Sequence, residues 1–262
     1  MKYFDSHSHY YDERFESELT EGVDEFIGAL LADSVSYIVN VGTMPSTSRL
    51  AIAQAKRFQN MYSTVGIHPG DTRFLSDMDA ELAECEALIR DPSSKCVCLG
   101  EIGLDYHYPE TDKEKQMRYF RAQMELARTL DMPVCIHDRE AHEDVMSVLR
   151  EYRGVRGVMH SYSGSAEMAR ELVGLGYMIS FSGTLTFTNA RKPKEAAAVV
   201  PQDMILIETD APYLAPHPLR GSLNHSGNLK YTNAQLAAIL GIGEDECAAL
   251  TEMNAKRFYG IS

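Results

Sequence analysis

The stretch Tyr3-Phe4-Asp5-Ser6-His7-Ser8-His9 opens the chain with a short strand pattern that runs into two histidines. A doubly wound α/β sheet typically has a glycine-rich turn after its first strand, and none follows here. Beyond this stretch, short β-rich runs alternate with longer helical patterns. We predict eight strands, mostly continuous apolar runs typical of parallel strands buried on both faces, over residues 3–7, 37–41, 61–65, 96–101, 133–137, 156–160, 177–181 and 204–207.

The segments between these strands have helical periodicity. One apolar helical face is formed by Leu19, Val23, Phe26, Ile27, Leu30 and Leu31. A later helix is expected to open with Thr111 and Glu114, which have the spacing of a capping box. Eight strands, each followed by a helix, are typical of a (β/α)8 TIM barrel of the α/β class. We therefore expect one TIM-barrel domain over residues 1–262, with the irregular stretch 211–231 as a functional loop.

Composition limits the classes of function. The chain has 25 Lys and Arg against 38 Asp and Glu, a net charge of −13, which argues against a protein that binds a polyanion by broad charge neutralisation. A local site that supplies positive charge as metal ions stays possible. The five cysteines form no Cys-x-x-Cys pair, as expected of a reduced protein without disulfides. With no long apolar run and no signal region, we expect a cytoplasmic monomer without membrane association.

Polar residues of ligand type follow the predicted strands at the end where TIM barrels build their active sites. They are His7, His9, His68, Glu101, His137, His160, Glu208 and Asp210. Side chains at positions i and i+2 of a strand share a face, so His7 and His9 can grip one divalent ion together. Such a cluster of imidazoles and carboxylates is hard to explain as packing. For Glu208 two roles stay open, a partner that fixes an imidazole tautomer or a structural hydrogen bond.

The alternation of side chains along a strand predicts which way the cysteines near Glu101 face. On the predicted strand 96–101, Val97, Leu99 and Glu101 share one face, while Cys96 and Cys98 share the other. With Glu101 towards the barrel axis, we expect both cysteines to face the helices as small buried apolar residues. Cys135 has the parity of His137 and is expected one layer below the site, as packing.

Other catalytic classes find little support in the sequence. It has no Gly-x-Ser-x-Gly elbow, no Gly-x-x-x-x-Gly-Lys phosphate loop and no Gly-x-Gly-x-x-Gly after a strand. We expect His107 and His142 to be solvated, and His217 and His225, in the last long loop, to lie on the surface. Tyr106, Tyr162 and Tyr213 follow ligand-type residues, and either base stacking or loop packing explains them.

Five blocks of sequence together resemble the TatD family of metal-dependent hydrolases and deoxyribonucleases. The blocks are His7-Ser8-His9, Gly100-Glu101-Ile102-Gly103-Leu104-Asp105-Tyr106, Ile136-His137-Asp138-Arg139, His160-Ser161-Tyr162-Ser163-Gly164 and Glu208-Thr209-Asp210-Ala211-Pro212-Tyr213-Leu214. They span almost the whole chain in order. The His-x-His alone is shared with the wider amidohydrolase-like superfamily, whereas the Gly-Glu block and the last block are specific.

The resemblance implies a barrel with a one- or two-metal centre. By matching positions, His7, His9 and Asp210 hold one ion, His137 and His160 hold the second, and Glu101 bridges them. Asp210 and Glu101 are then the expected catalytic residues, with Asp210 orienting and deprotonating the attacking water. The chain departs from the family pattern after His68 and after Asn224, where the usual Glu-Pro is missing. Substrate contacts are expected from His68, Arg139, Arg220 and Asn224.

The function implied is a divalent-metal-dependent nuclease that cleaves DNA phosphodiester bonds through a metal-activated water, as a 3′–5′ exonuclease. The alternative is a metal-dependent hydrolase of small phosphate esters or amides, because the same water activation serves either substrate. A metal-binding protein without activity is disfavoured, since all six ligands are present. Two ions are expected, and imidazole and carboxylate ligands suit Zn, Mn, Mg, Fe, Ni or Co. The expected partner is DNA or a small phosphorylated substrate.

Overall fold

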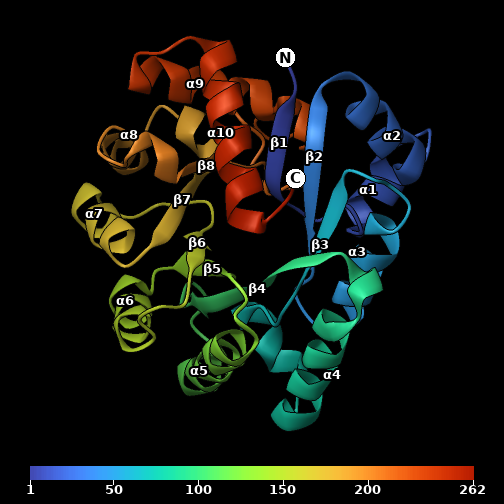
Figure 1. Ribbon diagram of the computed structural model, residues 1–262, viewed down its shortest axis with the longest axis vertical. Coiled ribbons are helices and arrows are strands. Elements are labelled where there is room, and N and C mark those ends of the chain that lie inside the picture. The colour runs from blue at the N-terminus through green and yellow to red at the C-terminus, as the bar shows by residue number, and fades with distance from the viewer.

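Eight parallel strands follow one another round a barrel in chain order in the computed structural model, which describes residues 1–262 (Figure 1). They are β1 (Tyr3–Ser8), β2 (Val35–Val41), β3 (Met61–Val65), β4 (Cys96–Asp105), β5 (Val134–Arg139), β6 (Gly157–Met159), β7 (Tyr177–Phe181) and β8 (Ile205–Ile207). The ends of β1 and β8 meet, because Asp210 N donates to His7 O at 2.9 Å and His9 N donates to Ala211 O at 2.7 Å. The chain is therefore a (β/α)8 TIM barrel, as predicted.

Helices surround the barrel on its outside (Figure 1). The α-helices are α1 (Glu13–Glu18), α2 (Val23–Asp33), α3 (Pro45–Ala55), α4 (Met78–Arg90), α5 (Lys113–Leu130), α6 (His142–Glu151), α7 (Ala166–Gly174), α8 (Arg191–Ala197), α9 (Leu229–Leu240) and α10 (Glu244–Tyr259). Short 3-10 turns are η1 (Pro69–Phe74), η2 (Pro92–Ser94), η3 (Gly183–Thr186), η4 (Gln202–Met204) and η5 (Ser226–Asn228). No helix combines the length and the apolar character needed to cross a bilayer.

The observed elements confirm all eight predicted strands, although some ends differ. β4 extends four residues beyond the predicted end, to Asp105. The prediction that a helix opens with a capping box at Thr111 is wrong. Helix α5 begins at Lys113, and Asp112 is its N-cap, whose side chain accepts a hydrogen bond from Lys115 N. An aspartate caps a helix as well as a threonine does, so the sequence offered two adjacent start signals.

Irregularities in β4 change which of its side chains face the barrel axis. Its pairing with β3 shifts register between Cys96 and Cys98, and its pairing with β5 shifts around Gly100, whose φ is +122°. As a result Cys98 packs in the interior with Cys135, and only Cys96 packs towards α4 and α5. The expectation that both cysteines face the helices is wrong for Cys98, because strict alternation fails where a strand carries a bulge.

Two apolar layers hold the barrel together. The outer layer lies between strands and helices, and the inner one fills the barrel near the N-terminal ends of its strands. The inner cluster includes the end of α10, where Tyr259 donates a hydrogen bond to Ser6 O at 3.0 Å. Its members are Phe4, Val39, Val41, Cys98, Cys135, Val158, Met178, Leu206, Ala255, Phe258, Tyr259 and Ile261. Helix α10 thus closes the bottom of the barrel and leaves the opposite end open for a site.

Candidate metal centre

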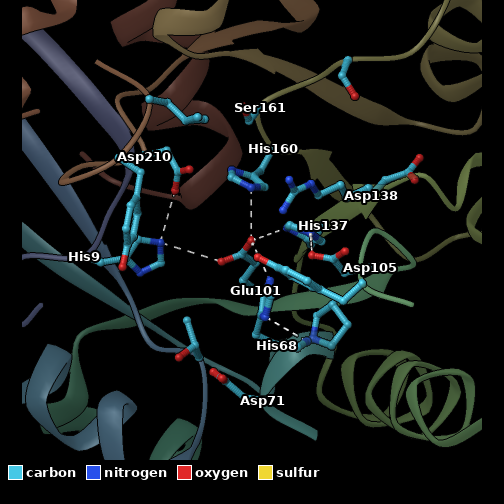
Figure 2. A pocket seen from close by; sticks show the side chains of 18 of the residues that line it. His9, His68, Asp71, Glu101, Asp105, His137, Asp138, His160, Ser161 and Asp210 are labelled. Carbon is cyan, nitrogen blue, oxygen red and sulfur yellow. Dashed lines mark hydrogen bonds and ion pairs between the residues drawn. The ribbon is translucent and has the colours of Figure 1, made fainter. Parts of the chain in front are cut away.

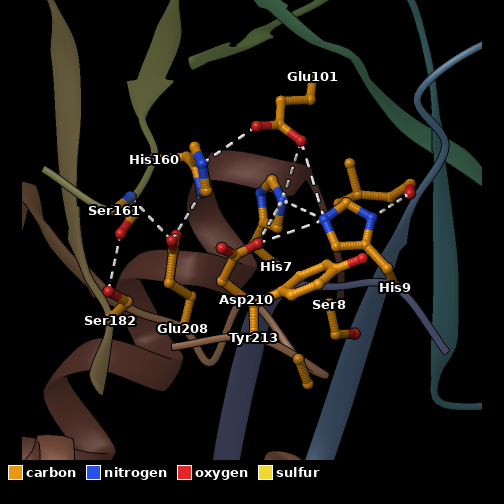
Figure 3. Close-up of polar contacts among 12 residues, drawn as sticks. His7, Ser8, His9, Glu101, His160, Ser161, Ser182, Glu208, Asp210 and Tyr213 are labelled. Carbon is orange, nitrogen blue, oxygen red and sulfur yellow. Dashed lines mark hydrogen bonds and ion pairs between the residues drawn. The ribbon is translucent and has the colours of Figure 1, made fainter. Parts of the chain in front are cut away.

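All six predicted metal ligands converge at the C-terminal ends of the strands (Figures 2 and 3). They come from β1, β4, β5 and the segments that follow β1, β6 and β8, namely His7, His9, Glu101, His137, His160 and Asp210. Five of them line a cleft of about 1300 Å³, and His7 is fully buried beside them. Four of the six are buried, while His137 and Asp210 are partly accessible from the cleft.

One group of ligand atoms gathers around His7 and His9. Five distances measured among the four facing atoms run from 3.1 to 3.8 Å, and these atoms are His7 Nε2, His9 Nε2, Glu101 Oε2 and Asp210 Oδ1. Metal–ligand bonds of about 2.0–2.2 Å in a tetrahedron put ligand atoms about 3.3–3.6 Å apart. The separations between the histidine nitrogens and the carboxylate oxygens, 3.3 to 3.8 Å, are close to this spacing, and the two histidine nitrogens lie slightly closer together, at 3.1 Å.

The second group uses the other oxygen of Glu101. Oε1 lies 2.7 Å from His137 Nδ1 and 3.1 Å from His160 Nε2. Because Oε2 faces the first group, the Glu101 carboxylate has one oxygen in each. This is the arrangement of a carboxylate that bridges two metal ions. The donor set of imidazoles and carboxylates thus fits the divalent ions expected from the sequence.

The outer nitrogens of the histidines are held by hydrogen bonds that fix their tautomers. His9 Nδ1 donates to Val41 O at 2.8 Å, and His160 Nδ1 donates to Glu208 at 2.8 Å. Nε2 is therefore the nitrogen that each ring offers to a metal ion once the ring is neutral (Figure 3). Glu208, for which the sequence left two roles open, is the partner that fixes an imidazole tautomer. His7 Nδ1 has a weaker neighbour, Cys135 Sγ at 3.4 Å.

Two aspartates that the sequence analysis missed support the centre. Asp105 Oδ2 lies 3.3 Å from His137 Nε2, which has no other polar partner. Asp5 is buried beneath the ligands and accepts hydrogen bonds from Thr209 and Ser226, which tie β1 to the loop after β8. Burial raises the pKa of Asp5 to about 7. A polar residue with the parity of His7 inside an apolar strand was the available signal for Asp5.

Opposing effects set the charges of the ligands. Burial favours the neutral ring of His137, but hydrogen bonds with Asp105 and Glu101 raise its pKa to about 9. Burial likewise opposes charge on Glu101, yet the surrounding imidazoles, His160 foremost, hold the pKa of this carboxyl well below its usual range. The centre therefore pairs an ionised carboxylate with protonated imidazole, and a metal ion that binds here displaces protons.

Local backbone strain places two residues of the site. Asp210 has φ +57° and Ser161 has φ +42°, both in the left-handed region that non-glycine residues rarely adopt. Ser161 N donates to Glu208 at 2.8 Å, and the Asp210 amide is bonded to His7 O. These bonds hold the strained turns after β6 and β8, which aim His160 and Asp210 into the cleft.

The predicted substrate residues separate into three cases. His68 and Arg139 line the cleft. Arg220 is exposed outside the lining, with its guanidinium 4.3 Å from the ring centroid of Phe187, which does line it. Asn224 is fully buried and does not reach the cleft. Its amide donates to Thr209 O and Tyr213 O, so it braces the loop after β8, and its position does not support a substrate contact.

The remaining predicted residues are also placed by the structure. Tyr213 lines the cleft, while Tyr162 is buried and Tyr106 donates a hydrogen bond to Asp144 on α6. His217 is exposed as expected. Three other histidines are less solvated than expected. His107 and His142 are accessible but paired with acidic side chains, and His225 is partly buried with its ring against Phe26.

Comparisons with known proteins agree with this geometry. The family model described as TatD related DNase matches residues 4–260. An uncharacterized metal-dependent hydrolase, YabD of Bacillus subtilis, is 38% identical over 99% of each chain. Another, named TatD, from Mycobacterium tuberculosis is 36% identical over 88% of each. The crystal structure of YJJV, a TatD homolog from Escherichia coli, superposes with a TM-score of 0.90 at 27% identity, covering 99% of this chain and 98% of that one.

Proposed function

Because the chain belongs to the TatD-related DNase family, we propose that it hydrolyses DNA phosphodiester bonds from the 3′ end with two divalent metal ions. Membership of the family makes the chain a metal-dependent hydrolase, while the DNA substrate and the exonuclease polarity are the proposal. The observation that carries it is the Glu101 carboxylate, which lines a large cleft and has one oxygen in each of two ligand groups. Phosphodiester hydrolysis is a typical reaction of such paired sites.

In this proposal each ligand has a defined place. His7, His9, Asp210 and Glu101 would hold one ion, and His137, His160 and Glu101 would hold the other. When bound, the ions supply Lewis acidity and activate water. Asp210 would orient the attacking water and accept its proton, since its Oδ2 makes no hydrogen bond within the protein and its side chain is 15% exposed, on the lining of the cleft. Burial opposes charge on Asp210, but the neighbouring histidines His9, His160 and His7 together lower the pKa of this carboxyl, so the carboxylate is ionised and able to accept a proton.

The cleft has features that suit a single nucleic-acid strand. Four cationic side chains line it, Arg73, Arg139, Arg191 and Lys192, and so do four aromatic side chains, Tyr11, Tyr108, Phe187 and Tyr213. Cations contact phosphates, and aromatic rings stack on bases without sequence preference. Arg139 already lies 5.7 Å from the centroid of Tyr108. These residues support DNA as the partner, and a cytoplasmic monomer is part of the same proposal.

A small phosphorylated substrate or an amide is the second candidate. The same cleft is lined by carboxylates outside the two ligand groups, including Asp12, Asp71, Glu110 and Asp112. Together with the net charge of −13, they repel a long polyanion more than a small ester. The two candidates share the metal centre and differ in what fills the outer cleft.

Digestion of 3′-labelled single-stranded DNA tests the proposal. The wild-type chain should release labelled nucleotides with added Mn²⁺ or Mg²⁺, and a chelator should abolish the release. His160→Ala should lose activity together with one bound ion per chain, whereas the exposed His217→Ala should behave as wild type. Bound metal without digestion of DNA would refute the nuclease and favour the small-molecule hydrolase.

A further inference from the structure

His68 lies beside the metal centre but differs from the histidines that are candidate metal ligands. It follows β3 and caps η1, and its ring lines the cleft with 18% of the side chain exposed. Its Nε2 makes no hydrogen bond within the protein and lies 3.6 Å from Glu101 Oε1, the oxygen that faces the second ligand group. The ring packs edge-on against His137, with centroids 4.5 Å apart (Figure 2). One nitrogen of His68 therefore faces the reacting region without a partner.

The tautomer of His68 is fixed by the backbone of Gly70. Gly70 N–H donates to His68 Nδ1 at 3.0 Å, so Nδ1 carries the lone pair and the proton of the ring lies on Nε2. A Cβ at position 70 would sit 3.1 Å from Nδ1 and 3.2 Å from Cε1, so glycine permits this approach. The His68 backbone is held in turn, because its N–H donates to Thr43 O at 2.8 Å.

This tautomer is the reverse of the one found in two metal ligands. His9 and His160 donate through Nδ1, so Nε2 is the nitrogen that each neutral ring offers to a metal ion. His68 accepts at Nδ1 and so directs an N–H at the centre. His68, Asp105 and His137 are close enough to hold a third ion, with ligand atoms within 4.8 Å of one another. A nitrogen that carries a proton is not a metal ligand, and this argues against a third ion.

We propose that His68 is a catalytic hydrogen-bond donor, which the Gly70 amide holds in the Nε2–H form so that it contacts the substrate oxygen gaining negative charge during hydrolysis. The inference rests on the proposed phosphodiester hydrolysis. Water attacks phosphorus, the P–O3′ bond breaks, and its electron pair and a proton end on O3′. His68 keeps its own proton throughout.

The kinetic test compares His68→Ala with His68→Gln. Alanine removes the donor and should lower kcat by about 10²–10³-fold with little change in KM, the loss typical of one donor to a developing charge. The glutamine amide can place an N–H near the position of Nε2 and should recover at least tenfold of that loss. Both variants should bind as many zinc ions per chain as wild type, which separates the donor from a metal ligand.

A direct reading of the tautomer does not depend on activity. In zinc-loaded protein with ¹⁵N-labelled histidine, the resonances that disappear in His68→Gln should show a protonated Nε2 and an unprotonated Nδ1. Gly70→Ala, which presses on the ring, should shift these resonances and lower kcat while retaining the metal. His217→Ala is the matched control and should change neither kcat nor the His68 signals.

The outcomes separate this inference from the proposed function. A His68 proton on Nδ1, a zinc ion lost from His68→Gln, or unchanged kcat in His68→Ala would overturn the donor role while a DNA-digesting wild type leaves the nuclease intact. If wild type cleaves bis(4-nitrophenyl) phosphate but not DNA, and His68→Ala impairs that cleavage, the donor role stands and the DNA substrate falls. Failure of wild type on both substrates would overturn both proposals.

Discussion

Glu208 is a buried side chain that is not itself a predicted metal ligand but orients one, His160. Its carboxylate accepts from His160 Nδ1 and from Ser161 N, both at 2.8 Å, and it is 1% exposed. Glu208→Gln keeps the shape but removes the charge that holds the imidazole. We expect zinc affinity to fall by about 10–100-fold, as for other partners of metal-bound histidines.

Titration of zinc into chelator-treated protein measures this effect. The matched control is Glu167→Gln, an exposed carboxylate on α7, which should leave the affinity unchanged. A Glu208→Gln chain that binds zinc within twofold of wild type would show that the hydrogen bond, and not the charge, orients His160.

At the scale of elements, the β4–β5 pair carries Glu101 and His137 and depends on glycines. Gly103 has φ +140°, and a Cβ there would overlap the carbonyl oxygen of His137 on β5. Gly103→Ala should therefore lower the free energy of unfolding by about 3 kcal/mol or more, through backbone strain and a forced separation of the strands. Denaturant unfolding measures it. Gly174→Ala, at the exposed end of α7, is the control and should be neutral or stabilising, so similar values for the two would contradict the argument.

The junction of β5 and α6 should give a pH-dependent stability. Asp138, 6% exposed in its side chain, accepts from His142 Nδ1 at 2.7 Å, and this bond raises the pKa of His142. A pKa raised on folding stabilises the fold fully below about 6.5, the value in the unfolded chain, and the stabilisation is lost as pH rises through the folded value. The stability difference between wild type and His142→Gln should thus be largest near pH 6 and shrink towards pH 9. Melting temperatures across this range measure it, and a difference that grows with pH would refute it.

The positions of the strands were predictable because strands buried on both faces consist of nearly continuous apolar runs. The ligands were predictable for a related reason, since parallel strands bring their C-terminal ends to one rim. His7 and Asp210 are 203 positions apart, yet the alternation pattern and the family motifs both place them at that rim.

Other features depend on contacts that no local pattern contains. The bulge that turns Cys98 inward arises from register shifts against two neighbouring strands. Asn224 matches a family motif in a surface loop, but its burial beneath Thr209 and Tyr213 is a tertiary outcome. The role of Asp105 depends on where the His137 ring points. Sequence therefore predicts which residues gather here better than it predicts what each one contacts.

At the scale of the whole molecule, the net negative charge repels DNA, whereas the cationic side chains of the cleft attract it. The chain carries −13 overall, so long-range attraction of DNA is absent. Positive charge in the cleft comes from four side chains, Arg73, Arg139, Arg191 and Lys192, together with the ions that the centre binds. DNA affinity should accordingly be weak, dependent on metal, and limited in its response to salt.

Fluorescence anisotropy with a labelled single strand, protected at its 3′ end by phosphorothioate linkages, tests this prediction. Each phosphate neutralised on a single strand contributes a slope of about −0.7 to the logarithm of affinity against the logarithm of salt concentration, so four cations give at most about −3. Arg139→Ala should reduce the slope by about 0.7. Arg150→Ala, which removes an exposed arginine paired with Glu171 on α7, should leave it unchanged. Tight binding in chelator, or a slope near −6, would mean that a basic surface outside the cleft binds the strand, and the cleft would then have to be abandoned as the DNA site.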